Sequence, residues 1–165
     1  MLNLGTKAFL KLLVLAIVER FNLSKKHKSK NTNPELKVRA HLRYNKINYR
    51  IHEKNLPGTP DIIIPRYKIA ININGCFWHQ HGCTNTKVPN SRREFWENKF
   101  DKIKSRDAEN RLKLENLRWH VIDLWECSIM NEDTLIEILK KLYFRMGILE
   151  WYGKVSDEEK INYAA

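Results

Sequence analysis

The sequence has little from which disulfides or membrane spans could be built. Its 165 residues include three cysteines, an odd number too small for a disulfide framework, and this favours reduced thiols. The apolar stretch at residues 12–18 is shorter than the roughly 20 residues that a membrane helix needs. No small-residue cleavage site follows it, which argues against secretion. We therefore expect a cytoplasmic protein with no membrane partner.

Acidic residues are scarce relative to basic ones. The chain has 19 Asp and Glu against 30 Lys and Arg, which gives a net charge of +11. Residues 24–54 hold ten of the basic residues and two acidic ones. Such clustering favours a polyanion, above all nucleic acid, because bound phosphates release counterions. Within this segment Lys28, Lys30 and Arg39 are candidate phosphate contacts, although an acidic protein or a membrane surface attracts the same charge.

Internal repeats and low-complexity segments are absent from the sequence, and its length fits one α/β domain. We expect an apolar helical segment within residues 1–21, whose role the sequence does not reveal. The domain itself is expected at residues 22–148, beginning with a basic arm, and a tail at residues 149–165.

Local patterns predict the elements of this domain. Thr32 and Glu35 have capping-box spacing and predict a helix over 34–45, although the alternation at 36–44 is that of a strand. Ser91 and Glu94 have the same spacing and predict a long helix over 91–117. Its expected apolar side consists of Phe95, Trp96, Phe100, Ile103, Ala108 and Leu112. β-branched and aromatic runs predict strands, and a last apolar period predicts a helix over 132–146. The expected strands are 49–52, 61–64, 69–73 and 119–125, the middle two forming a hairpin.

The stretch 74–83 gathers metal-ligating side chains at the end of a predicted strand. A structural zinc site needs four thiolate or imidazole ligands in a tetrahedral arrangement. Cys76, Cys83 and Cys127 supply three, and either His79 or His81 can complete the set. The alternative is that these are reduced cysteines and surface histidines.

Acidic and aromatic residues near this stretch suggest hydrolysis of nucleic acid. Asp61 opens an apolar strand after a Pro-rich turn, where a carboxylate can bind Mg²⁺, although an Asp there is often only a turn residue. Glu35 has a similar structural alternative as a capping residue. Phe77 and Trp78 cannot point the same way in an extended chain, so we expect at least one of them to stack on bases.

Several segments together resemble the very short patch repair (Vsr) endonucleases over about residues 22–127. These segments, in chain order, are Asn31–Leu36, Tyr49–His52, Leu56–Asp61, Gly75–His79, Lys87–Pro89, Glu94–Trp96, Arg106–Asp107 and Leu124–Cys127. The resemblance implies a restriction endonuclease-like core of the PD-(D/E)xK type, with a central mixed sheet flanked by helices and a structural zinc. It also implies Mg²⁺-dependent nicking of duplex DNA on the 5′ side of the thymine in a T:G mismatch.

The resemblance also implies roles for individual residues. Asp61 and the backbone carbonyl of Ile73 would bind Mg²⁺, His79 would act on the attacking water, and Glu35 would hold metal-bound water. The family's zinc ligands fall on Cys76, His81, Cys83 and Cys127, and its DNA-wedging aromatics fall on Phe77, Trp78 and Trp96. Asn74 stands where many members have a second active-site histidine, and Ile103 stands where an asparagine is common.

Two other functions fit the same residues. One is a site-specific restriction or nicking enzyme that acts on paired DNA. The other is a catalytically inactive, zinc-stapled DNA-binding module. For the mismatch endonuclease we expect a nucleoid-associated protein for which a monomer suffices, together with possible repair-protein partners.

Overall fold

The computed structural model of the chain describes residues 30–147. The expected N-terminal helix, Lys28 and the tail at 149–165 lie outside the described residues. The chain divides into two compact units, of which the first ends at Cys127 and the second begins at Ser128. All of the sequence-predicted site residues except Lys28 lie in the described part of the first unit.

A four-stranded mixed sheet organises the first unit, as the sequence predicts. Its strands are β1 (Arg50–Ile51), β2 (Ile62–Ile64), β3 (Ile69–Asn74) and β4 (His120–Trp125), in the order β1-β2-β3-β4. β2 pairs with β1 and β3 in antiparallel fashion, and the short 3₁₀ turn η1 (Pro65–Tyr67) closes the predicted hairpin. β4 runs parallel to β3, so the ends of these two strands lie at the same edge of the sheet.

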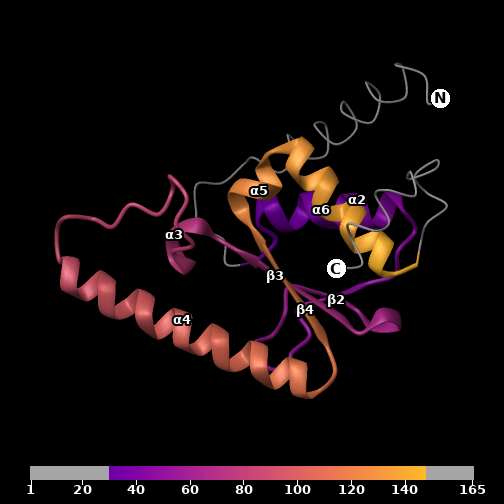
Figure 1. Cartoon of the computed structure of the whole chain (residues 1–165), viewed down its shortest axis with the longest axis horizontal. Coiled ribbons are helices and arrows are strands. Elements are labelled where there is room, and N and C mark those ends of the chain that lie inside the picture. Colours follow the sequence, from indigo (N-terminus) through magenta and orange to yellow (C-terminus); the bar gives the residue numbers. More distant parts are fainter. Residues whose placement is uncertain (1–29, 148–165) are drawn as a thin grey trace. The chain divides into compact units, whose positions relative to one another are not determined.

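Helices flank this sheet, and the α/β class is confirmed. α2 (Asn33–Tyr44) and α4 (Arg93–Asn116) lie on opposite sides of the strands in Figure 1. Ile63, Ala70 and Val121 are neighbours across β2, β3 and β4, and Leu114 of α4 packs on them in one buried cluster. α5 (Glu126–Met130) follows β4 directly, and α6 (Glu132–Arg145) lies in the second unit. Among residues 30–147, no helix is long and apolar enough to cross a membrane.

The start signals of α2 outweigh the strand-like alternation that follows them. The Glu35 carboxylate accepts hydrogen bonds from the Thr32 backbone N–H at 3.3 Å and from the Thr32 hydroxyl at 2.9 Å. This is the reciprocal bond of a capping box, and it satisfies a backbone donor that the helix itself leaves unpaired.

Two predictions about α4 are wrong. The helix begins at Arg93, and its cap is Arg92 in a left-handed conformation (φ 54°), so Ser91 caps nothing. Its expected apolar side is only partly buried. Phe100 is buried and Trp96 and Ile103 are half-buried, but Phe95 and Leu112 are 53% and 58% accessible. The other buried residue of α4 is Leu114, which the sequence does not predict on that side. The physical reason is that the sheet covers only the end of the helix that carries Leu114.

The expectation of an extended chain at Phe77 and Trp78 is also wrong. Cys76–His79 form one helical turn, α3, which Gly75 caps. Neighbouring side chains are therefore splayed by about 100° rather than opposed, and the Phe77 and Trp78 rings meet edge to face at 5.1 Å.

Candidate active site and metal centre

Asp61 lies at the start of β2, beside the end of β3. Its Oδ2 accepts a hydrogen bond of 2.7 Å from the Ile73 backbone N–H. Burial of the carboxyl raises the pKa of Asp61 above its usual value, and nearby Glu35 raises it further. The Ile73 N–H, His52 and Arg39 act in the opposite direction but do not cancel the effect of burial. A bound cation would therefore stabilise the ionised carboxylate of Asp61, which burial disfavours.

Two pockets adjoin at Asp61, Ile73 and His79, which line both of them. The larger, of about 870 Å³, is otherwise lined mainly by aromatic and acidic side chains, including Glu35, Phe77, Trp78, Trp96 and Glu126. The smaller, of about 440 Å³, is lined by polar and charged side chains, including Asn74, the basic residues Lys104, Arg106 and Arg111, and the acidic residues Asp107 and Asp123. Aromatic side chains suit stacking on bases, and Lys and Arg side chains suit contact with phosphates.

Glu35 projects from α2 and is buried, yet each of its oxygens has partners. Besides the two bonds from Thr32, its Oε2 accepts bonds from the Asn31 backbone N–H at 3.1 Å and from Arg39 Nη2 at 2.5 Å. Glu35 thus caps the helix and lines the larger pocket at once. The capping role and a place beside Asp61 are both compatible with its position.

Arg39 does not lie on an exposed basic face, contrary to the expectation of a phosphate contact. Its side chain is buried, the residue being 5% accessible, and its guanidinium bonds to Glu35. Lys30, by contrast, is exposed.

His52 is a residue of this cluster to which sequence reasoning gave no role. Its Nε2 lies 3.6 Å from Glu35 Oε2, and its backbone N–H donates to the Asp61 carbonyl at 3.1 Å. Glu35, His52 and Asp61 offer oxygen and nitrogen atoms within 4.8 Å of one another. The backbone of His52 is left-handed (φ 48°), which is uncommon for a residue other than glycine. The sequence predicts His52 only as the last residue of the strand 49–52.

Asp107 is the second residue that sequence reasoning left without a role. His79 Nδ1 lies 2.6 Å from Asp107 Oδ2, although 28 positions separate the two residues. A carboxylate at this distance accepts a hydrogen bond from the Nδ1–H group, which favours the tautomer of the neutral imidazole whose Nε2 is an acceptor. Arg106 donates to the other Asp107 oxygen at 2.8 Å.

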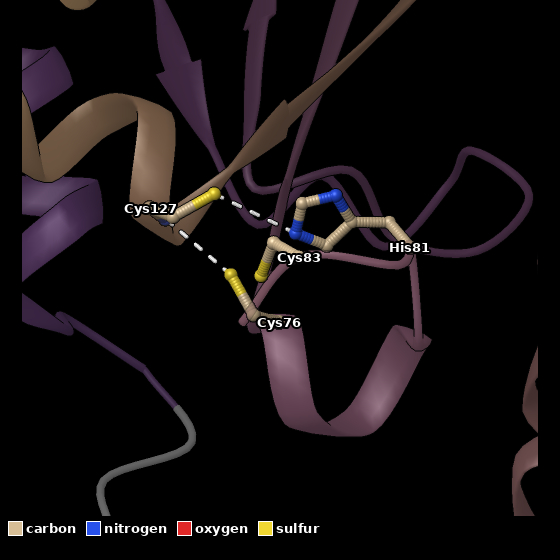
Figure 2. Close-up of side chains that lie close together, drawn as sticks. All are labelled: Cys76, His81, Cys83 and Cys127. Carbon is tan, nitrogen blue, oxygen red and sulfur yellow. Dashed lines mark hydrogen bonds between the residues drawn. The ribbon is translucent and has the colours of Figure 1, made fainter. Parts of the chain in front are cut away.

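Four metal-ligating side chains converge where β3 and β4 end. Figure 2 shows Cys76, His81, Cys83 and Cys127 pointing toward one another, and their ligand atoms all lie within 4.8 Å. Asn74 of β3 pairs with Trp125 of β4, so Cys76 and Cys127 each follow the paired strands by two residues. This register explains how cysteines 51 positions apart meet, with the Cys127 N–H donating to Cys76 Sγ at 3.4 Å.

The chemistry of this donor set fits zinc. Three thiols and one imidazole make a Cys₃His site, and His79 lies outside the cluster. Burial raises the pKa of the Cys76 thiol to about 12, so at neutral pH without a cation it stays protonated. Binding of a cation would therefore release protons.

Aromatic rings from α3 and α4 form a cluster on one side of the larger pocket. Phe77 contacts Trp96 edge to face at 5.4 Å, and Trp96 stacks on Phe100 at 5.9 Å. Trp78 is 42% accessible, whereas Phe77 is half-buried. Lys99 Nζ lies 5.1 Å from the centre of the Trp78 ring, so a cation and an exposed aromatic face occur together here.

The chain is similar in sequence to known endonucleases. A family model described as DNA mismatch endonuclease Vsr matches residues 14–85. The type II nicking enzyme V.XorIIP of Xanthomonas oryzae pv. oryzae is 36% identical over 115 residues, which are 70% of this chain and 85% of that protein. V.NmeAIP of Neisseria meningitidis, also a type II nicking enzyme, is 39% identical over 69% of this chain and 81% of its own length.

The DNA mismatch endonuclease Vsr of Escherichia coli is also similar, with 38% identity over 54% of this chain and 57% of that protein. The resemblance predicted from the sequence motifs is thus confirmed by the family match and by the identity to these relatives. The chain is an endonuclease that belongs to the Vsr DNA mismatch endonuclease family.

Proposed function

We propose that the chain is a Mg²⁺-dependent endonuclease of restriction endonuclease-like fold that nicks duplex DNA on the 5′ side of the thymine in a T:G mismatch. The observation that carries this proposal is the position of Asp61, where an aromatic pocket and a pocket of polar and charged side chains adjoin, beside the paired His79 and Asp107. We place its action in the cytoplasm, where reduced thiols persist.

The residues around Asp61 fit a hard cation. The Ile73 N–H holds one Asp61 oxygen, and the other oxygen together with the Ile73 carbonyl would bind Mg²⁺, which prefers oxygen ligands. A bound Mg²⁺ supplies a Lewis acid that activates water and neutralises charge on the phosphate. Glu35 would orient water at this cation, and Asn74 would contact the phosphate in the smaller pocket.

His79 is proposed to accept the proton of the attacking water on Nε2. This role needs the tautomer that Asp107 enforces through Nδ1.

Asp107→Asn should therefore lower the single-turnover nicking rate by about 100-fold, because the amide no longer fixes that tautomer. A gel assay with labelled duplex measures the rate, and Glu109→Gln on the exposed side of the same helix is the matched control. Equal rates for Asp107→Asn and Glu109→Gln would remove Asp107 from the mechanism.

DNA contact is proposed at two places. Trp78, an exposed member of the aromatic cluster, would wedge into the duplex beside the mismatch, with Phe77 and Trp96 supporting it. Lys30 would contact phosphate, together with Lys28 from the basic arm.

Zn²⁺ is proposed at Cys76, His81, Cys83 and Cys127, where it would hold α3 and its aromatics at the edge of the sheet.

The proposal is tested with two duplexes that differ only in one base pair, T:G or C:G. We expect Mg²⁺-dependent nicking of the T:G duplex and at least about 100-fold slower nicking of the matched one. Several relatives are named type II nicking enzymes, so nicking of paired DNA is the second candidate function. Equal nicking of both duplexes would establish that candidate, and binding without nicking would identify an inactive DNA-binding module.

A further inference from the structure

Arg39 is a buried cation beside the proposed metal site. Its Nη2 donates to Glu35 Oε2 at 2.5 Å, and its Nη1 donates to Asn31 Oδ1 at 2.6 Å. The same Nη2 lies 3.3 Å from His52 Nε2. In any hydrogen bond between these two groups the guanidinium is the donor, because it has no acceptor atom. Two side chains beside Asp61 are thus engaged by one permanent positive charge.

The donors that Arg39 engages are those of a potential metal site. Glu35, His52 and Asp61 together offer two carboxylates and an imidazole within 4.8 Å, a donor set that suits Mn²⁺ and other transition metals. The guanidinium contacts two of these three residues, and its charge cannot be lost by deprotonation. A divalent cation that bound Glu35 Oε2 and His52 Nε2 would therefore compete with Arg39 for both atoms.

Because Arg39 is buried, its side chain is not exposed for contact with DNA. The residue is 5% accessible, and its Nε has no hydrogen-bond partner in the described part of the chain. The orientation of the Arg39 guanidinium is therefore set by its partners Glu35 and Asn31, and not by solvent or a phosphate.

We propose that Arg39 is a positioning residue, a built-in cation that occupies Glu35 and His52 and so confines the catalytic divalent cation to Asp61. The proposal rests on the proposed function of Asp61. It predicts a single divalent-cation site in the wild-type protein, and a second site at Glu35 and His52 once the guanidinium is removed.

Mn²⁺ titration of the zinc-loaded full chain without DNA tests this, with free Mn²⁺ followed by electron paramagnetic resonance. Wild type should bind about one Mn²⁺ and Arg39→Gln about two, because both freed donors suit this ion. Arg43→Gln, which removes an exposed charge from the same helix, should behave as wild type. An unchanged stoichiometry in folded Arg39→Gln would overturn the proposal.

Two further variants keep the test informative even where Arg39→Gln does not fold. His52→Ala alone should leave Mn²⁺ binding unchanged, since Arg39 already withholds His52 from the cation. A wild-type stoichiometry of about two, or a fivefold or larger loss of affinity in His52→Ala, would overturn the proposal. Asp61→Asn distinguishes failure of the proposed function from failure of the Arg39 proposal. If this variant kept the wild-type Mn²⁺ site, the assignment of Asp61 would be wrong, whereas the Arg39→Gln stoichiometry would still decide the role of Arg39.

Discussion

Asp61→Asn should abolish nicking and leave DNA binding intact. The amide keeps the size of the side chain and can still accept the hydrogen bond from the Ile73 N–H, but it loses the charge that would hold a cation. Loss of cation-assisted charge stabilisation is worth several kcal/mol, so we expect at least about a thousandfold lower single-turnover rate. Asp101→Asn, an exposed carboxylate on α4, is the matched control.

The same substitution should raise the stability of the zinc-loaded protein when Mg²⁺ is absent. Burial raises the pKa of Asp61 in the folded state, so ionised Asp61 opposes folding. The favourable contribution of the protonated carboxyl exists fully below the unfolded pKa, near 3.8, and is lost as the pH rises through the folded value. At pH 7.5 the variant should therefore melt at a higher temperature than wild type.

Calorimetry at two pH values and two Mg²⁺ concentrations measures this stability difference. The difference between Asp61→Asn and wild type should shrink below about pH 4, where the Asp61 carboxyl and the amide that replaces it are both neutral. It should also shrink in Mg²⁺, because the bound cation stabilises the ionised carboxylate of the wild type. A variant that is less stable than wild type at pH 7.5 without Mg²⁺ would contradict the account of Asp61 as a desolvated carboxylate.

Removal of zinc should unfold the first unit. Cys127 is 51 positions from Cys76, and their shared cation would cross-link the ends of β3 and β4. Structural zinc contributes folding free energy directly, and its loss should lower Tm by more than about 10 °C. Circular dichroism melts of chelated and reconstituted protein, with zinc measured by mass spectrometry, test this expectation.

Neighbouring histidines provide the matched pair for the zinc experiment. His81→Ala should lose zinc and stability, because His81 Nε2 lies 3.5 Å from Cys127 Sγ within the cluster. His79→Ala should keep its zinc and its Tm while losing activity. Folded, active protein without zinc would refute the structural role of the metal.

Local chemistry made some parts of the fold predictable. The capping pair at Thr32 and Glu35 and the isoleucine-rich hairpin are encoded within a few residues, so neighbouring positions suffice to predict α2, β2 and β3. A shared metal site for the three cysteines could be proposed because a structural zinc site needs several thiolate ligands. The fourth ligand needed the family motif, since spacing alone left His79 and His81 open.

Long-range pairing explains what could not be predicted. Asp107 meets His79 through the packing of α4 beside α3, and His52 lies beside Asp61 because β1 pairs with β2. Arg39 looked like one of many surface cations, whereas tertiary packing buries it against Glu35. The apolar side of α4 was overestimated because a 24-residue helix extends beyond the sheet that covers it.

The central claim is that strand cleavage is directed to the thymine of a T:G mismatch. The most direct measurement is a competition in one tube between T:G and C:G duplexes of the same length, with each of the four strands carrying its own dye. The account predicts that, in Mg²⁺, product appears only from the thymine-containing strand of the T:G duplex, cut immediately 5′ to that thymine. Equal cutting of the matched duplex, or cutting at another position, would contradict it.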